Sequence, residues 1–536
     1  MASSSLIRGS KTTLTNPSIR RSVLRHRVFT PSISSTCHQR YQGTWSSVVG
    51  TAKSLLGSQD PPPPSSSKSS NNNTSSSQPP KPIIRDPLEL VGRELTSLRS
   101  NVSSLLGSGH PSLDTIAKYY FQAEGKHVRP LMVLLMARAT NGHSPLWPEL
   151  LARSRAQSQP TAEAVENEMG INEPLSPKDV LNDFNPHMEG MEGKLPEMPA
   201  TGDAATEEMR RLATEGGDAN ILPTQRRLAE ITEMIHVASL LHDDVIDNSE
   251  MRRGTASAPS AFGNKLSILG GDFLLARASV ALARLRNCEV VELLATVIAN
   301  LVEGEVMQLQ AQSSNSHPSA HKSAFTSFWN SPAEQEAREK AAEANAVNAN
   351  GPSAAMFEHY LQKTYLKTAA LIGKSTRAAT ILGGFGEDAI RASGCGSEAE
   401  LMAKNVRDAA YTFGRNVGIA FQLVDDLLDF RSTSAAFGKP SGGADLRLGL
   451  ATAPVLFAWQ EYPQEQLGEM VKRKFSQEGD VEYALNIVRK SKGLERTTEL
   501  AKHHAQLASD ALAQLPQSEA RDALEQLNEQ IISRVK

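Results

Sequence analysis

Two copies of the pattern D-D-x-x-D, each inside an apolar helical run, most strongly limit what this chain can fold into. The first copy is Asp243-Asp244-Val245-Ile246-Asp247, and the second is Asp425-Asp426-Leu427-Leu428-Asp429. On a helix of 3.6 residues per turn, His236, Asp243 and Asp247 lie in one stripe, because offsets of seven and eleven residues return to nearly the same angle. One face of the first helix therefore carries a histidine and two acids.

The surroundings of both motifs are apolar, so each helix is expected to be buried. Burying like charges one helical turn apart is unfavourable unless a cation neutralises them. A single motif of this kind is more often a solvated acidic stripe, but two copies within hydrophobic helices argue against that interpretation. Oxygen ligands suit Mg²⁺, which binds a few carboxylates together with substrate phosphates. The sequence therefore predicts a magnesium site and a diphosphate substrate.

Basic residues that suit a diphosphate occur in two further places. Arg252 and Arg253 follow the first motif by five residues, within Met251 to Ala258, which is predicted as a loop. Arginine offers planar, bidentate donors to phosphate oxygens. Lys126 and Arg129 are about one helical turn apart within Gly125–Pro130. A phosphate-binding P-loop is excluded there, since the first glycine is missing and a histidine stands where Ser or Thr is required.

The arrangement of these motifs resembles that of the trans-polyprenyl diphosphate synthases. The similarity is carried by Gly125 to Pro130, Ile221 to Gly254 and Phe421 to Pro454, and it covers roughly residues 85–141 and 221–536. More narrowly, the chain is similar to the mitochondrial hexa- to decaprenyl diphosphate synthases of ubiquinone biosynthesis. The resemblance implies an all-α, isoprenoid-synthase-type helical bundle around a central cavity. It also implies Mg²⁺-dependent addition of isopentenyl diphosphate units to an allylic diphosphate.

The resemblance assigns a role to each candidate residue. The metal ligands are Asp243, Asp247 and Asp425, and the catalytic set adds Asp429 and Lys367. Isopentenyl diphosphate is assigned to Lys126, Arg129, His236 and Arg253. The allylic diphosphate is assigned to Arg252, Lys367, Thr368 and Gln422, with Lys439 as a further phosphate contact. The family usually has lysine where Leu450 stands, a departure that affects no metal ligand.

The composition independently favours an all-α fold, because sustained alternation is scarce while Ala, Leu, Glu, Lys and Arg are abundant. A helical pattern begins at about Asp86, and Tyr360 to Gly373 is predicted as one helix. The polar stretches 142–220 and 313–355 are predicted to be surface insertions. Residues 85–536 then form one synthase domain.

The N-terminal 84 residues have a different composition. No acid precedes Asp60, while arginines are spread among serines and threonines, as in a mitochondrial transit peptide. A Pro/Ser/Asn-rich linker follows to about Pro82. We therefore expect a mitochondrial matrix protein with peripheral contact to the inner membrane, and no transmembrane helix. A net charge of −3 gives no sign of a nucleic-acid partner.

Several other functions share part of this pattern with a long-chain synthase. A terpene cyclase usually carries an Asn/Ser/Glu-type second site, which the second aspartate motif replaces here. A di-iron bundle is suggested by Glu233-x-x-His236, but no second copy stands in a suitable helix. A shorter-chain synthase and a non-catalytic scaffold subunit remain as alternatives, although a scaffold is expected to have lost motif residues. Small residues at Ala238 and Ser239, before the first motif, favour a long product, and a homodimer is expected.

Overall fold

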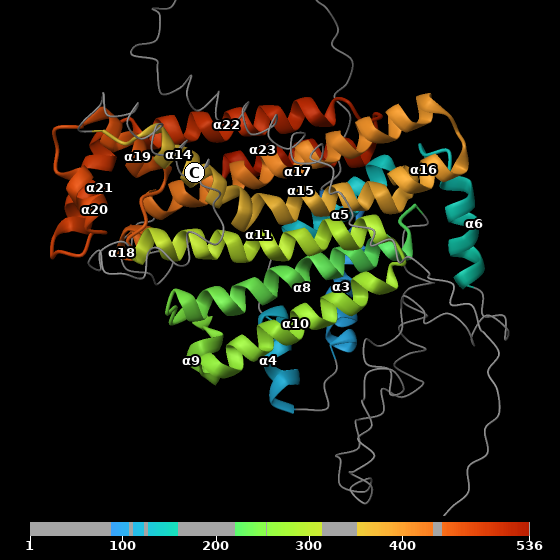
Figure 1. The fold of residues 1–536 in the computed structure, drawn as a ribbon, viewed down its shortest axis with the longest axis horizontal. Coiled ribbons are helices and arrows are strands. Elements are labelled where there is room, and N and C mark those ends of the chain that lie inside the picture. The colour runs from blue at the N-terminus through green and yellow to red at the C-terminus, as the bar shows by residue number, and fades with distance from the viewer. Residues whose placement is uncertain are drawn as a thin grey trace, which may run out of the picture. The chain divides into compact units, whose positions relative to one another are not determined.

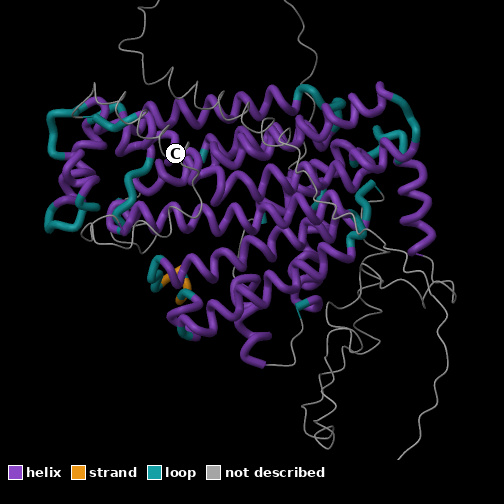
Figure 2. The backbone as a smooth tube through the Cα atoms, in the orientation of Figure 1, coloured by secondary structure: helices purple, strands orange, loops and turns teal. Residues whose placement is uncertain are grey.

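The computed structural model describes residues 87–106, 111–122, 127–158, 220–252, 254–313, 351–431 and 442–534, all within the compact unit Pro64–Lys536. Helices make up most of this described chain (Figure 1). Figure 2 shows strand only at one short ribbon. The predicted all-α class is therefore confirmed. The transit peptide and linker predicted for residues 1–84 lie outside the described residues.

The elements before residue 314 form the first part of the bundle. They are α2 (Pro87–Leu90), α3 (Gly92–Leu105), α4 (Pro111–Gln122), α5 (Val128–Thr140), α6 (Trp147–Ser158), α8 (Pro223–Ile246), β1 (Met251–Arg252), β2 (Thr255–Ala256), α9 (Ala258–Phe262), α10 (Asn264–Arg284) and α11 (Cys288–Ser313).

The elements after residue 350 complete the bundle. They are α14 (Ala354–Thr364), the π-helical turn η2 (Tyr365–Ala369), α15 (Ala370–Thr380), the π-helical turn η3 (Ile381–Phe385), α16 (Glu387–Ser393), α17 (Ser397–Arg431), α18 (Ala444–Arg447), α19 (Ala453–Glu461), α20 (Leu467–Lys472), α21 (Asp480–Lys490), α22 (Gly493–Leu512) and α23 (Glu519–Ser533).

Helix α8, which carries the first acidic motif, is enclosed by other helices. Pro223 is its first residue, where the fixed φ of proline suits a helix. The Leu222 amide donates to the Gln225 side chain at 3.0 Å. Most of its residues as far as Ala238 are buried, and it packs against α5, α10 and α15. The motif therefore lies at the end of a helix that the core holds rigidly.

Helix α17, which carries the second motif, packs very closely against η2 and α15. A Cβ added to Gly414 would lie 2.8 Å from the Gly373 Cα, and one added to Gly418 would lie 2.6 Å from the Ala369 Cα. Only glycine permits such a close backbone approach. This packing brings Gln422 of α17 next to Thr368 of η2, with the Thr368 hydroxyl donating to the Gln422 amide oxygen at 2.9 Å.

Three local expectations differ from the structure. The stretch Tyr360 to Gly373 is interrupted by the π-turn η2, so it is not one uniform helix. Residues Met251 to Ala256, expected as a loop, pair as the antiparallel ribbon β1–β2. Within the predicted insertion 142–220, α6 is helical and packs against η3, whereas residues 159–219 lie outside the described residues.

Helix α10 is long and apolar enough to cross a membrane by length and composition, although the sequence predicted no such segment. Its apolar window is 39% buried, and the helix packs against α4, α8 and α9. These contacts make α10 part of the bundle and leave much of its apolar surface uncovered.

Candidate active site

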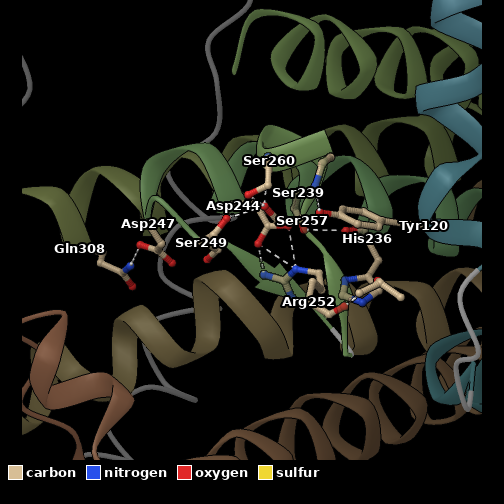
Figure 3. A network of polar contacts seen from close by, with 12 residues as sticks. Tyr120, His236, Ser239, Asp244, Asp247, Ser249, Arg252, Ser257, Ser260 and Gln308 are labelled. Carbon is tan, nitrogen blue, oxygen red and sulfur yellow. Dashed lines mark hydrogen bonds and ion pairs between the residues drawn. The ribbon is translucent and has the colours of Figure 1, made fainter. Parts of the chain in front are cut away.

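The outer aspartates of the first motif face a cluster contributed by α11 and η2. Lys367 of η2 forms an ion pair with Glu305 of α11, and its ammonium donates to the Gln308 side chain at 3.2 Å. The Gln308 amide in turn donates to Asp247 at 3.3 Å (Figure 3). A π-helical turn carries Lys367, and such turns are frequent at functional sites.

The electrostatics of this cluster favour a cation. Burial raises the pKa of Asp243 to about 8, Lys367 opposes this rise, and Glu305 and Asp247 add to it. Burial also raises the pKa of Asp247. Lys367 lowers this pKa, and Glu305 raises it further. Three carboxyl groups therefore share one lysine, which leaves an excess of negative charge.

The second motif presents Asp425 to two arginines. The Arg534 guanidinium of the C-terminal segment lies 3.8 Å from an Asp425 oxygen and 5.0 Å from the centre of the Phe421 ring. Burial raises the pKa of Asp425 to about 6, while Arg534 and Arg129 lower it. Asp429 is already engaged, because its oxygens accept the backbone amides of Ala444 and Asp445 at 2.9 and 3.1 Å.

The two motifs approach each other across η2 and the end of α14. Asp445 of α18, which follows the second motif, has its pKa raised to about 8, mainly by burial, with contributions from Asp426, Asp429 and Asp247 of the first motif. Lys363 interacts electrostatically with Asp426, Asp445 and Glu305, and burial lowers its pKa. Lys363 and Lys367 therefore lie between the two sets of acids.

The middle aspartate of each motif is buried and hydrogen-bonded within the protein. Asp244 is fully inaccessible, accepts the Tyr120 hydroxyl, and forms an ion pair with Arg252 at 2.5 Å (Figure 3). Asp426 accepts the Tyr360 hydroxyl at 2.6 Å and the Gln422 amide at 3.0 Å. Both middle acids thus act as hydrogen-bond acceptors inside the protein.

The residues assigned to isopentenyl diphosphate are brought together in part. Arg129 at the start of α5 contacts the His236 ring nitrogen at 2.9 Å, and Arg129 also acts on the pKa of Asp425. His236 therefore lies between the first motif on its own helix and an arginine that faces the second motif. The remaining predicted phosphate ligands, Lys126, Arg253 and Lys439, lie outside the described residues.

The donor set fits a hard divalent cation. The candidate ligands are carboxylate oxygens whose pKa values are raised by burial, and oxygen ligands are those that such a cation prefers. Among the described residues, no group of three or more His, Cys, Asp or Glu side chains is close enough to hold a metal by itself.

Several residues of the site were missed by sequence reasoning. Glu305 and Gln308 are one helical turn apart before the second predicted insertion. This spacing is the one sequence feature that could have indicated that both belong to the site. No local sequence pattern assigns a site role to Tyr120, Lys363 or Arg534, because their partners are far away in the chain.

Comparison with known proteins agrees with this geometry. The family model described as polyprenyl synthetase matches residues 205–488. A relative from Yarrowia lipolytica, named probable mitochondrial hexaprenyl pyrophosphate synthase, is 45% identical over 454 residues, which cover 84% of this chain and 86% of the relative. Decaprenyl-diphosphate synthase subunit 1 of Schizosaccharomyces pombe is 37% identical over 452 residues, which cover 84% of this chain and 92% of the relative.

Solved structures share the fold. A decaprenyl diphosphate synthase from Rhodobacter capsulatus has a TM-score of 0.54 at 25% identity, covering 84% of this chain and 98% of that chain. A polyprenyl synthase from Caulobacter crescentus, described as complexed with calcium and isoprenyl diphosphate, has a TM-score of 0.54 at 24% identity, covering 84% of this chain and 97% of that chain.

A helical bundle that joins two aspartate motifs to lysine and arginine side chains defines a metal-dependent prenyltransferase. This chain belongs to the polyprenyl synthetase family. Within that family it is a mitochondrial long-chain polyprenyl diphosphate synthase, and the family uses a divalent metal. The predictions of family, activity and compartment are confirmed.

The raised pKa values predict how stability depends on pH and metal. Asp243 and Asp445 have folded-state pKa values of about 8, above those of the unfolded chain. The folded protein therefore binds more protons, so these groups favour folding most at low pH, and their contribution is lost as pH rises toward 8. A bound divalent cation replaces the protons, so the increase in Tm caused by Mg²⁺ should grow by about 2 °C per pH unit between pH 6 and 8.

Differential scanning fluorimetry at several pH values, with Mg²⁺ or EDTA, measures this dependence. The variant Asp243→Asn serves as the control, because it removes one of the titrating groups and should flatten the curve. A Tm increase that stays constant from pH 6 to 8 would contradict the assignment.

Proposed function

We propose that this enzyme extends an allylic diphosphate primer by successive additions of isopentenyl diphosphate, with Mg²⁺ as its cation, and that its long all-trans product supplies the side chain of ubiquinone. One observation carries the proposal: Lys367 lies against the acids of the first motif, while the adjacent Thr368 is hydrogen-bonded to Gln422 of the second-motif helix. A diphosphate held at Lys367 and Thr368 would thus be within reach of both motifs.

The first half-reaction breaks the allylic C–O bond. Both bonding electrons go to the departing diphosphate, so negative charge grows on its oxygens. Asp243, Asp247 and Asp425 would hold Mg²⁺, which supplies positive charge to the leaving group when bound. Lys367 and Arg252 add fixed positive charge on the same side, and no side-chain nucleophile is required.

The second half-reaction joins the two substrates. The isopentenyl double bond attacks the allylic carbon, a C–C bond forms, and a proton leaves the adjacent carbon. Arg129 and His236, in contact at 2.9 Å, would hold the isopentenyl diphosphate together with Lys126 and Arg253. Asp429, which accepts two backbone amides, would hold the segment after the second motif in place.

Substitution of the outer aspartates tests the proposal most directly. With farnesyl diphosphate, isopentenyl diphosphate and Mg²⁺, Asp243→Ala and Asp425→Ala should each lower kcat by about 10²–10³-fold, because stabilisation of the leaving group is often the largest catalytic term. The exposed acid Asp510 of α22 provides a matched control, and Asp510→Ala should keep full turnover. Near-normal kcat in either motif variant would refute the two-motif site.

Product length is proposed to depend on Ser239. A chain held by its diphosphate at Asp243 extends along α8 toward Ile231, and one helical turn, about 5.4 Å, is close to one isoprene unit. Ser239 lies one turn before Asp243 and is half-buried, and its hydroxyl donates to the His236 carbonyl of its own helix at 2.8 Å. Ala238 is fully buried, so a larger side chain there would overpack the core.

With farnesyl diphosphate as primer, the variant Ser239→Phe should therefore shorten the products to about C20 while condensation continues. Thin-layer chromatography of dephosphorylated products measures their length, and Ser239→Ala, which keeps the space open, should retain the long product. If Ser239→Phe still makes the wild-type product, the chain does not pass this residue.

A homodimer is proposed from the apolar faces of α10 and α11. The exposed fractions are 53% for Leu269 of α10 and 58% for Val302 of α11. Because less than half of the apolar window of α10 is buried, water would contact much apolar surface in a monomer. The Schizosaccharomyces pombe relative is named as a subunit, so a mixed assembly is the competing outcome.

Sedimentation velocity of the purified chain should give a dimer, and the double variant Leu269→Glu/Val302→Glu should give a monomer because charge opposes burial of these faces. The matched control is Leu401→Glu, at a site 59% exposed on α17, which should leave the dimer intact. A wild-type chain that sediments as a monomer would refute the homodimer.

A further inference from the structure

Helix α4 holds the ribbon that carries Arg252. The Tyr120 hydroxyl accepts the Ala258 amide at 2.7 Å and donates to Asp244 (Figure 3). The neighbouring Tyr119 hydroxyl donates to the Ala256 carbonyl at 3.0 Å. Two adjacent tyrosines thus contact the chain just after the first motif, but only Tyr120 reaches the motif itself.

Asp244 transmits this contact to Arg252. The Arg252 Nε donates to both Asp244 oxygens at 2.8 Å, and one Nη donates to Oδ1 at 2.5 Å. Oδ2 therefore accepts from both Tyr120 and Arg252. Asp244 is fully buried, so loss of the tyrosine hydroxyl cannot be compensated by bulk water, and the carboxylate would lose one of the contacts that set its orientation.

Arg252 keeps donors for a ligand. Its guanidinium has five N–H bonds, and within the described chain Asp244 receives only those of Nε and one of Nη2. Its side chain is 28% exposed, so part of it can be reached from solvent. A guanidinium fixed along one edge and open along the other is suited to bidentate contact with a phosphate.

We propose that Tyr120 is a positioning residue for allylic diphosphate binding: its hydroxyl fixes Asp244, which fixes the guanidinium of Arg252 toward the substrate. This inference rests on the proposed function, in which Arg252 binds the allylic diphosphate. The second motif is built in the same way, because Tyr360 donates to Asp426, and Asp426 accepts from Gln422, another residue assigned to that substrate.

The variant Tyr120→Phe keeps the ring and removes only the hydroxyl. A lost hydrogen bond to a charged group corresponds to about a tenfold effect, so kcat/KM for farnesyl diphosphate should fall about tenfold, whereas the KM for isopentenyl diphosphate should change less than about twofold. The control Tyr483→Phe removes another tyrosine hydroxyl, which donates to Glu465 at 2.5 Å outside this network, and should leave both values unchanged.

A double-mutant cycle separates positioning from a merely structural role. In an Arg252→Ala background, Tyr120→Phe should have almost no further effect on the farnesyl diphosphate parameters, because the group it positions is gone. If the tenfold effect persists there, or if both substrates are affected equally, Tyr120 does not act through Arg252 and the inference is overturned.

Two further results complete the test. If Tyr120→Phe is too unstable to assay, Asp244→Asn, which keeps the shape of the side chain, should show the same bias toward farnesyl diphosphate, and equal effects on both substrates would overturn the inference. If Arg252→Ala alone leaves the farnesyl diphosphate parameters unchanged, the assignment of Arg252 in the proposed function fails. A different outcome, in which Arg252→Ala impairs the use of farnesyl diphosphate but Tyr120→Phe does not, would overturn only the inference about Tyr120.

Discussion

The rest of this structure depends on carboxyl groups being held together where water is scarce. Burial and mutual repulsion raise the pKa values of Asp243 and Asp247, and the largest opposing group for both is Lys367, which Glu305 also engages. Such an arrangement is unfavourable for a protein without its ligands. On the proposed function, a divalent cation and a diphosphate would make it favourable, because the cation would neutralise the acids and the diphosphate would neutralise the cation and the lysine.

The aspartates of each motif have different surroundings because neighbouring residues on a helix point about 100° apart. The outer aspartates of the first motif face Lys367 and Glu305, whereas Asp244 and Asp426 are buried. Each of these two accepts a tyrosine hydroxyl and a second donor that is assigned to substrate. On the proposed function, the same short sequence would supply both the metal ligands and the acceptors that orient the phosphate-binding side chains.

The packing of the helices determines which of these groups meet. The close approach of α17 to η2 and α15, which the glycines at 414 and 418 permit, places Gln422 against Thr368. The π-turn η2 lies at the same point and carries Lys367. The two departures from regular helix packing thus coincide with the site, while the long helices around them provide a rigid apolar frame.

The sequence by itself determined the chemistry and the helices that carry it, because acid spacing and apolar surroundings are local properties that specify one charged face on each helix. Together with the family resemblance, it also identified Arg129 and His236, which the structure brings into contact. Only the tertiary structure decided the partners of the middle aspartates and the roles of Glu305 and Arg534. Tyr120 and Asp244 are separated by 124 positions in the chain. Periodicity states which side of a helix a residue occupies, but the neighbour it meets depends on the register and angle between helices, which no local pattern contains.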